Sequence, residues 1–156
     1  MISTANSSHH SQIHAINANA GVFTPDEVRC VDDIFAEYIQ KGAIASGYEF
    51  LVALDGETVL GYACFGPRPL TQGTYDLYWI AVDPHSRQKG VGRALLTASE
   101  ENVRQSGGHL LFVETSGSEK YHSTRQFYHA TGYLLEATIR DFYQPGDDLV
   151  IFTKHL

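Results

Sequence analysis

The sequence has few cysteines, few basic residues and no long apolar run, and each scarcity excludes a class of protein. Two cysteines in 156 residues make neither a disulfide framework nor a CxxC metal site, so we expect Cys30 and Cys64 to be free buried thiols in a reducing cytoplasm. No apolar stretch reaches the ~18 residues that a membrane span needs. The first twenty residues have neither the basic start nor the apolar centre of a secretory signal. We therefore expect a cytoplasmic protein without a membrane segment.

Positive charge is also scarce. Eleven Lys and Arg against eighteen Asp and Glu give a net charge of -7, which argues against nucleic acid as a partner, because phosphate affinity comes from clustered basic residues. Cationic small molecules or basic peptides remain open as partners. With 43% hydrophobic and 19% charged residues, the chain has the composition of a folded protein, and its length suits one domain. We expect residues 1–12 to be a disordered tail and residues 13–156 to form that domain.

The pattern of apolar residues and turn signals alternates strands with helices. Thr24 and Glu27 form a capping box around Pro25, which predicts a helix start, and Gly42 predicts the end of that helix. The expected strands cover residues 13–18 (marginal), 48–54, 58–65, 75–82, 109–115, 133–139 and 149–154, and the expected helices cover 25–40, 90–106 and 121–130. Hairpins followed by strand-helix-strand units indicate a mixed α/β sheet with at least one parallel crossover.

The segment between the expected strand at 75–82 and the following helix has the features of an anion site. Three of the eleven basic residues fall within residues 87–93, and Gly90 and Gly92 let the backbone turn sharply and approach a ligand. The free N–H groups of the first helical turn would face a phosphate or pyrophosphate at the positive end of the helix dipole. The segment lacks both the Lys-Ser/Thr ending of an NTPase loop and the GxGxxG order of a dinucleotide fold.

Two motifs in this region resemble those of the GCN5-related N-acetyltransferases, the GNAT superfamily. Arg87-x-x-Gly90-x-Gly92, after the strand that ends at Val82, resembles the acetyl-CoA loop of the family. Phe127-Tyr128-x-x-x-Gly132-Tyr133 resembles its second signature, at a helix-to-strand turn. The resemblance covers roughly residues 22–156. It implies a mixed, mostly antiparallel central sheet with a splayed parallel strand pair and helices on both faces.

The resemblance also implies acetyl-CoA as co-substrate and assigns residues to it. The backbone of Ile80, Ala81 and Val82 would hold the pantetheine arm, as the edge of a strand can do with an amide-containing ligand. The pyrophosphate would lie on the backbone amides of the following segment, which contains Arg87, Gln88, Lys89, Gly90, Val91, Gly92 and Arg93. Family members often carry an Asn seven residues before the motif tyrosine. Here that position is Tyr121, so stacking or a hydroxyl hydrogen bond would replace the contact.

Acetyl transfer to an amine needs a proton acceptor for the amine, a proton donor for the leaving thiolate and donors for the oxyanion. The resemblance assigns the proton donor to Tyr128. Asp76, six residues before Val82 on the same strand, is the first candidate for the base, and Glu114 on the next strand is the second. Backbone N–H groups around Ala81 and Val82 would hold the oxyanion. An amine acceptor, either a small cation or a peptide or protein amine, would react directly in a ternary complex.

The segment between the last two expected strands is the candidate acceptor site. Tyr143, Asp147 and Asp148 suit an ammonium group on an apolar body, by charge pairing and cation–π contact. The same residues also fit a plain hairpin turn with an acidic tip. We expect no metal site, and homodimerisation through an edge strand is open. The competing hypothesis is a non-catalytic acyl-CoA sensor, which would need neither Tyr128 nor a base.

Overall fold

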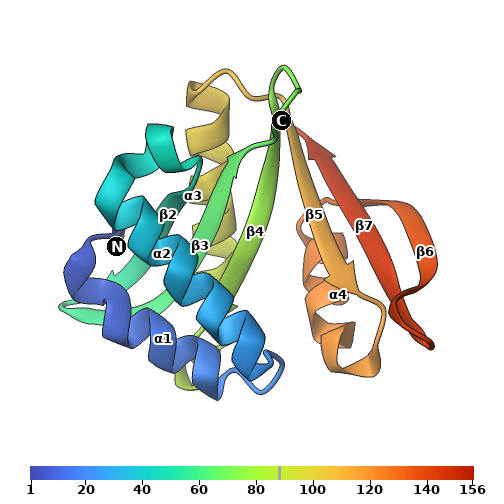
Figure 1. Ribbon diagram of the computed structural model, residues 1–156, viewed down its shortest axis with the longest axis horizontal. Coiled ribbons are helices and arrows are strands. Elements are labelled where there is room, and N and C mark those ends of the chain that lie inside the picture. The colour runs from blue at the N-terminus through green and yellow to red at the C-terminus, as the bar shows by residue number, and fades with distance from the viewer. Residues whose placement is uncertain (88) are drawn as a thin grey trace.

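The molecule is built on a seven-stranded sheet in the order β1-β2-β3-β4-β5-β7-β6, with helices on both faces (Figure 1). The computed structural model describes residues 1–87 and 89–156. The strands are β1 (Ile2–Thr4), β2 (Glu49–Asp55), β3 (Thr58–Pro67), β4 (Thr74–Val82), β5 (Leu110–Ser116), β6 (Leu134–Gln144) and β7 (Asp147–His155). The α-helices are α1 (His10–Asn19), α2 (Pro25–Ser46), α3 (Val91–Gln105) and α4 (His122–Ala130), and short 3-10 turns are η1 (Ser7–His9), η2 (Pro84–Ser86) and η3 (Glu119–Tyr121). Within the described residues β4 and β5 are the parallel pair, and all other neighbours are antiparallel. The fold is therefore the mixed sheet that the sequence predicts.

Alternation along the central strands divides the core between the two faces of the sheet. On β2, Phe50 and Val52 pack toward α1 and α2, whereas Leu51 and Ala53 pack toward α3 and α4. Successive side chains of a strand point to opposite faces, so a strand buried on both sides reads as a continuous apolar run. Burial of each apolar side chain contributes roughly 1.5–3 kcal/mol, which holds the helices on their faces of the sheet.

The expected disordered tail is wrong. Residues 2–4 form β1, which pairs with β2, and the backbone N–H of Ala5 continues the pairing to the carbonyl of Phe50. The marginal strand expected at 13–18 is also wrong, because this segment lies in α1. Its apolar residues Ile13 and Ile16 are buried three positions apart, a spacing that fits a helix better than a strand.

The helix expected at 25–40 begins where the capping box places it and is longer than expected. Thr24 accepts a hydrogen bond from the backbone of Glu27, whose side chain reaches back to the backbone N–H of Thr24. Helical geometry does break at Gly42 (φ 79°), as expected, but a further turn follows up to Ser46. Cys30 lies on the exposed side of this helix, so the expectation that both thiols are buried holds for Cys64 alone.

The second half of the chain follows the expected order of elements. The helices α3 and α4 begin within one residue of the expected positions, and β6 and β7 extend further than expected, so that only a short turn joins them. β6 lies at the edge of the sheet and all of its residues are exposed. No helix among residues 1–87 and 89–156 has the length and apolar character needed to cross a membrane.

Candidate active site

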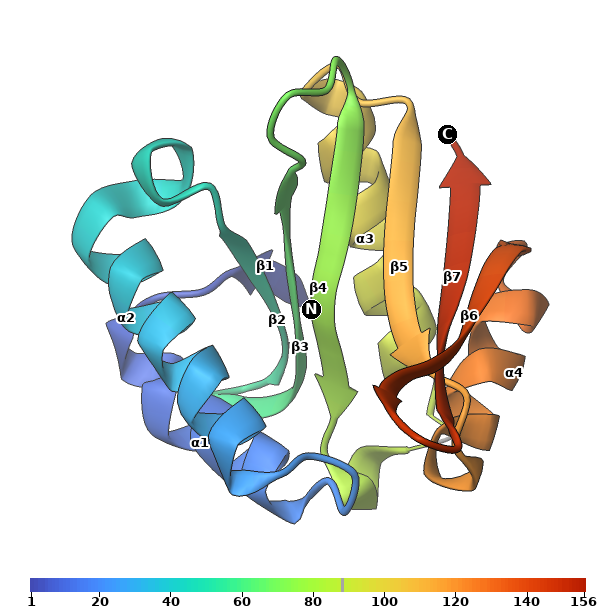
Figure 2. The same cartoon turned by 45° about the vertical axis from the view of Figure 1, so that its right-hand side comes forward.

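The parallel strands β4 and β5 separate soon after they pair. Pairing covers only Thr74–Asp76 and Leu110–Phe112, and beyond it the two strands diverge like the arms of a V (Figures 1 and 2). In the described structure residues 77–82 pair with β3 on one side and have no strand partner on the β5 side. The backbone of Ile80–Val82, which the resemblance assigns to the pantetheine arm, therefore has an open edge facing the gap.

A bulge on β4 explains where the strands separate. Cys64 of β3 lies opposite Trp79, whereas the next residue, Phe65, lies opposite Leu77, so Tyr78 is an extra residue on β4. A bulge bends its strand and increases the local twist. Because the bulge follows the last residue paired with β5, it turns β4 away from its parallel neighbour at that point.

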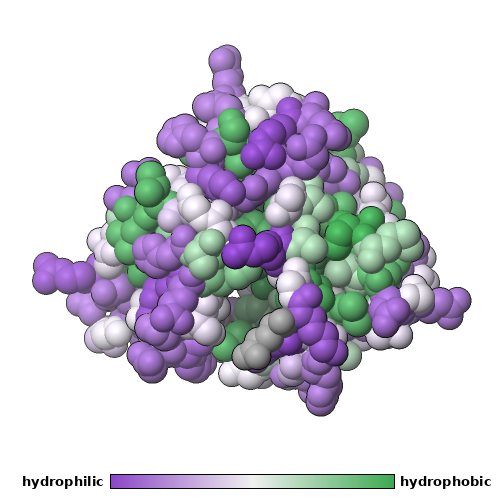
Figure 3. All heavy atoms as spheres, turned by 180° about the vertical axis from the view of Figure 1, so that it is seen from behind, coloured by the Kyte–Doolittle hydropathy of each residue, from purple (hydrophilic) through white to green (hydrophobic). Residues whose placement is uncertain are grey.

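The gap is a cleft of about 1290 Å³. Figure 3 shows it as a hollow in the face of the molecule seen from behind. Its walls come from β4 and β5, the loop before α2, the start of α3, η3 and α4, and the turn between β6 and β7. The cleft therefore brings together segments from almost the whole chain, including most of the residues that the sequence indicates.

The start of α3 at the cleft is free of the usual caps. Gly90 occupies the N-cap position with φ 79°, a left-handed conformation that glycine adopts without steric cost. No side chain caps the first N–H groups, and the first turn contains no acidic residue. The uncapped N–H groups and the positive end of the helix dipole make this helix start a candidate anion site.

The basic side chains around this helix start hold neighbouring segments in place. The Arg87 guanidinium donates to the backbone carbonyl of Ala20, at 2.9 Å, and Arg93 donates to a carbonyl at the end of α4, at 3.4 Å. Lys89 is exposed. Gln88, also expected at the pyrophosphate, lies outside the described residues. The backbone amides, rather than the arginine side chains, are thus the open groups at this end of the cleft.

Gly92, the second residue of α3, lies on the cleft wall. A Cβ atom built on it would meet Phe127 and Val82 at 3.6 Å, which is an ordinary van der Waals contact. Packing within the protein therefore does not require glycine at this position. The absence of a side chain also leaves room for a ligand to approach the backbone here.

Tyr128 places a buried phenol at the cleft. Its side chain is only 3% exposed and packs against Tyr133 and Phe152, with ring centroids 5.5 and 5.6 Å away. Among the described residues its hydroxyl has no hydrogen-bond partner, and the residue lines the cleft. Burial raises the pKa of Tyr128 above its ordinary value, so the phenol keeps its proton near neutral pH. A protonated, unpartnered hydroxyl is suited to donate a proton to a ligand.

The two candidate bases have different surroundings. Asp76 is 8% exposed and forms an ion pair with Arg68, whose Nη1 lies 2.7 Å from the carboxylate. The guanidinium of Arg68 also lies over the ring of Phe112, 4.7 Å from its centroid. Glu114 is exposed, and both carboxylates line the cleft. The carboxylate of Asp76 is thus engaged by a cation, whereas that of Glu114 is exposed at the cleft.

Aromatic hydroxyls and carboxylates line the end of the cleft opposite the β4–β5 pairing. The hydroxyl of Tyr121 donates to the carbonyl of Val22, at 3.3 Å, and so joins η3 to the loop before α2. Burial, followed by neighbouring carboxylates, raises the pKa of Tyr121 to about 12. Tyr143 and Asp147 also line the cleft, and Asp147 accepts a hydrogen bond from Ser116, at 2.5 Å.

Two residues at this end differ from the sequence expectation. Asp148 is not part of the cleft lining, and its carboxylate accepts a hydrogen bond from the backbone N–H of Asp141, so it holds the β6–β7 turn. Glu27 does line the cleft, and its charge is among the causes that raise the pKa of Tyr121 and of Tyr143. Sequence reasoning treated Glu27 only as part of a capping box, which the structure also shows.

Sequence reasoning also missed Arg68. It follows β3, in the turn to β4, and the hairpin register brings it back to Asp76. A basic residue a few positions from a proposed catalytic carboxylate, across an expected turn, was the signal that could have found this pair. In the described residues no three His, Cys, Asp or Glu side chains are grouped as metal ligands.

A mixed sheet that opens between two parallel strands, with an uncapped helix start at the open end, is the architecture of the GNAT acetyltransferases. The chain belongs to this family: residues 15–133 match the model of the acetyltransferase (GNAT) family. The structure of a GNAT-family protein from Desulfovibrio desulfuricans is 42% identical, with a TM-score of 0.96 over 99% of this chain and 98% of that chain.

Two further comparisons are more distant. The S-(2-succino)cysteine N-acetyltransferase of Bacillus subtilis (strain 168) is 30% identical over 70 residues, 45% of this chain and 42% of the relative. The match therefore spans less than half the length of that curated relative. An aminoglycoside 6'-N-acetyltransferase in complex with coenzyme A has a TM-score of 0.78 and 14% identity, covering 99% of this chain and 96% of that chain. At such identity the likeness shows the fold alone.

Proposed function

We propose that the protein transfers an acetyl group from acetyl-CoA to a primary amine, directly, within a ternary complex. The observation that carries the proposal is the protonated, unpartnered hydroxyl of Tyr128 in the same cleft as the uncapped start of α3. An anion site alone would suit a sensor that only binds acyl-CoA. A buried proton donor, in a cleft that acidic residues also line, is what acyl transfer needs in addition.

The residues act in sequence along the cleft. The amides at the start of α3 hold the pyrophosphate, and the open edge of β4 around Ile80 holds the pantetheine arm. Acetyl-CoA supplies an activated thioester. Glu114 takes the proton of the acceptor ammonium through water, and the free amine forms the new carbon–nitrogen bond. N–H groups around Ala81 and Val82 stabilise the oxyanion. As the carbon–sulfur bond breaks, Tyr128 gives its proton to the sulfur, and the second proton of the nitrogen passes through water to the tyrosinate, so that CoA leaves as the thiol and the amide is neutral.

The acceptor end favours a cationic amine. Glu27, Tyr143 and Asp147 line it from three different elements, so an ammonium group meets both carboxylate and aromatic surfaces there. A small polyamine-like cation and the amine of a peptide or protein both have this chemistry. Asp148 contributes through the turn that it holds rather than by contact.

Calorimetry and an amine panel test the proposed function together. We expect acetyl-CoA to bind and CoA release to require a cationic amine. Asp147→Asn should raise KM for that amine about tenfold, because a charge-assisted hydrogen bond contributes roughly 1.5–3 kcal/mol. Asp55→Asn, in the distant β2–β3 turn, is the matched control. Binding without turnover on the whole panel would support the sensor instead, and turnover restricted to neutral or anionic amines would overturn the cationic acceptor.

The choice of base has its own test. Glu114→Gln should lower kcat/KM at pH 7 by about 10²-fold, the lower end of what general-base catalysis contributes. The loss should shrink as the pH rises toward ~10.4, because an alkyl amine then loses its proton to water. Asp76→Asn should instead lower stability by leaving Arg68 unpaired, with a loss of activity that does not depend on pH. The reverse pattern would assign the base to Asp76.

We also propose that the protein is cytoplasmic and forms a homodimer. Both cysteines are free and Cys30 is exposed, which fits a reducing, cytoplasmic compartment. The net charge of -7 speaks against nucleic acid as a partner. The exposed edge strand β6, with Leu134 64% and Leu135 50% exposed, is the surface through which we propose a homodimer, to be checked by sedimentation velocity.

A further inference from the structure

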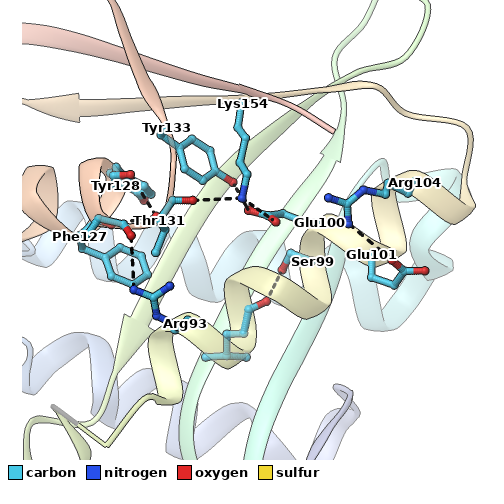
Figure 4. Close-up of polar contacts among 12 residues, drawn as sticks. Arg93, Ser99, Glu100, Glu101, Arg104, Phe127, Tyr128, Thr131, Tyr133 and Lys154 are labelled. Carbon is cyan, nitrogen blue, oxygen red and sulfur yellow. Dashed lines mark hydrogen bonds and ion pairs between the residues drawn. The ribbon is translucent and has the colours of Figure 1, made fainter.

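A partly buried ion pair lies outside the cleft lining and outside the residues that the proposed reaction uses. Glu100 of α3 accepts two hydrogen bonds from Nζ of Lys154 on β7, at 2.9 and 3.0 Å. The side chains are 7% and 25% exposed, respectively. The hydroxyl of Tyr133 donates to the same carboxylate, at 3.0 Å, and Lys154 also donates to the carbonyl of Thr131, at 3.0 Å (Figure 4).

This ion pair joins the two arms of the V. Helix α3 packs on the β2–β4 side of the sheet and its first turn forms the anion site, whereas Lys154, Thr131 and Tyr133 belong to the β5–β7 arm with α4. β4 and β5 themselves hold the arms together through only three residue pairs. The distance across the cleft therefore depends on other contacts between the arms, which include the Glu100–Lys154 ion pair and the hydrogen bond from Arg93 to the end of α4.

The same contacts fix the end of α4 that carries Tyr128. Nζ of Lys154 donates a hydrogen bond to the carbonyl of Thr131, just beyond the C-terminus of α4. A cation at this position also complements the helix dipole. The ring of Tyr133, held through its hydroxyl by Glu100, packs 5.5 Å from the ring of Tyr128. The backbone N–H of Tyr133 also donates to the carbonyl of Tyr128, at 3.0 Å. Each partner of the pair thus reaches Tyr128 through one intermediate residue.

We infer that Glu100 and Lys154 are positioning residues, which set the proton of Tyr128 at the right distance from the ligand held by α3. The inference rests on the proposed function, because it assumes that Tyr128 is the proton donor. A misplacement of about 1 Å from such a remote change can cost ~10²-fold in rate. The pair touches neither reacting partner, so its effect acts through Tyr128.

The experiment replaces both members of the ion pair at once, so that neither charge is left without its partner. The double variant Glu100→Gln/Lys154→Met keeps similar side-chain volumes and leaves no unpaired ion, whereas each single variant leaves a charge without its partner, which by itself is strongly destabilising. We expect kcat of the double variant to fall 10- to 100-fold. The dissociation constant for acetyl-CoA, measured by calorimetry, should change less than threefold. The conservative variant Lys154→Arg, which keeps the positive charge, should retain most of the kcat of the parent protein. Glu101→Gln, which removes a charge from the exposed pair with Arg104, is the matched control.

A double-mutant cycle with Tyr128→Phe separates positioning from a general structural role. If the pair positions the hydroxyl, removing that hydroxyl should cost much less in the double-variant background than in the parent protein. Equal losses in both backgrounds, or an unchanged kcat in the double variant, would overturn the inference. If Tyr128→Phe costs nothing in the parent protein, the proton-donor assignment fails instead, and the two failures are thereby distinguished.

Discussion

Replacing Tyr128 by Phe lowers kcat by roughly 10- to 10³-fold, the range expected when a general acid is lost. The phenol is buried and has no partner among the described residues, so its removal leaves no other group unsatisfied and the fold intact. Thermal unfolding and the calorimetric affinity for acetyl-CoA should match the parent protein. The quantity that changes is turnover, measured as CoA release.

The pH profile adds a second readout for this residue. Because burial raises the pKa of Tyr128 above its ordinary value of ~10, the parent enzyme should not lose its proton donor as the pH rises toward 10. Tyr75→Phe is the matched control, since Tyr75 lies on β4 and does not line the cleft. Unchanged turnover of Tyr128→Phe at unchanged stability would remove Tyr128 from the mechanism and leave proton donation to water.

Replacing Gly92 by Ala separates ligand binding from folding. The new Cβ meets Phe127 and Val82 at ordinary distances, so the free protein accommodates it. Alanine also favours the helix, by about 0.5–1 kcal/mol over glycine. The unfolding free energy should therefore stay the same or rise, while the affinity for acetyl-CoA falls 10- to 100-fold, because the methyl group occupies the space where the pyrophosphate approaches the amides.

The control is the opposite substitution, alanine to glycine, two residues further along the same helix. Ala94→Gly lies on the exposed side of the same helix and outside the cleft lining, so it should lower stability and leave the affinity for acetyl-CoA unchanged. A general disturbance of α3 would lower both the stability of the protein and its affinity for acetyl-CoA. It would not lower the affinity alone, as we expect for Gly92→Ala. An unchanged affinity of Gly92→Ala would contradict the placement of the pyrophosphate at this helix start.

Local signals in the sequence were sufficient where the determining contacts are close in the chain. The capping box at Thr24 and Glu27 placed the start of α2, because it satisfies backbone N–H groups within a few residues. Gly90 marked the start of α3, because glycine readily adopts the left-handed conformation found at the N-cap of that helix. The motif around Tyr128 led to the family, which the family match of residues 15–133 confirms.

The errors arose where distant segments decide the structure. Residues 2–4 form a strand because they pair with the edge of β2. Residues 10–19 form α1 because Ile13 and Ile16 pack against one face of the sheet. Helices of this length depend on tertiary packing more than on propensity, so a sequence window of ten residues does not reveal them. Likewise, the register of the β3–β4 hairpin decides that Arg68 returns to Asp76.

The sequence by itself determined the class of fold and indicated a candidate anion site at residues 87–93, since both follow from short-range patterns, and the family resemblance added the candidate proton donor Tyr128. Only the tertiary structure decided how these parts meet. The bulge at Tyr78 opens the cleft, and Glu100 and Lys154 come together from positions 54 residues apart, outside the cleft lining. The physical reason is that pairing register and burial are properties of segments in contact, and a linear sequence does not display which segments those are.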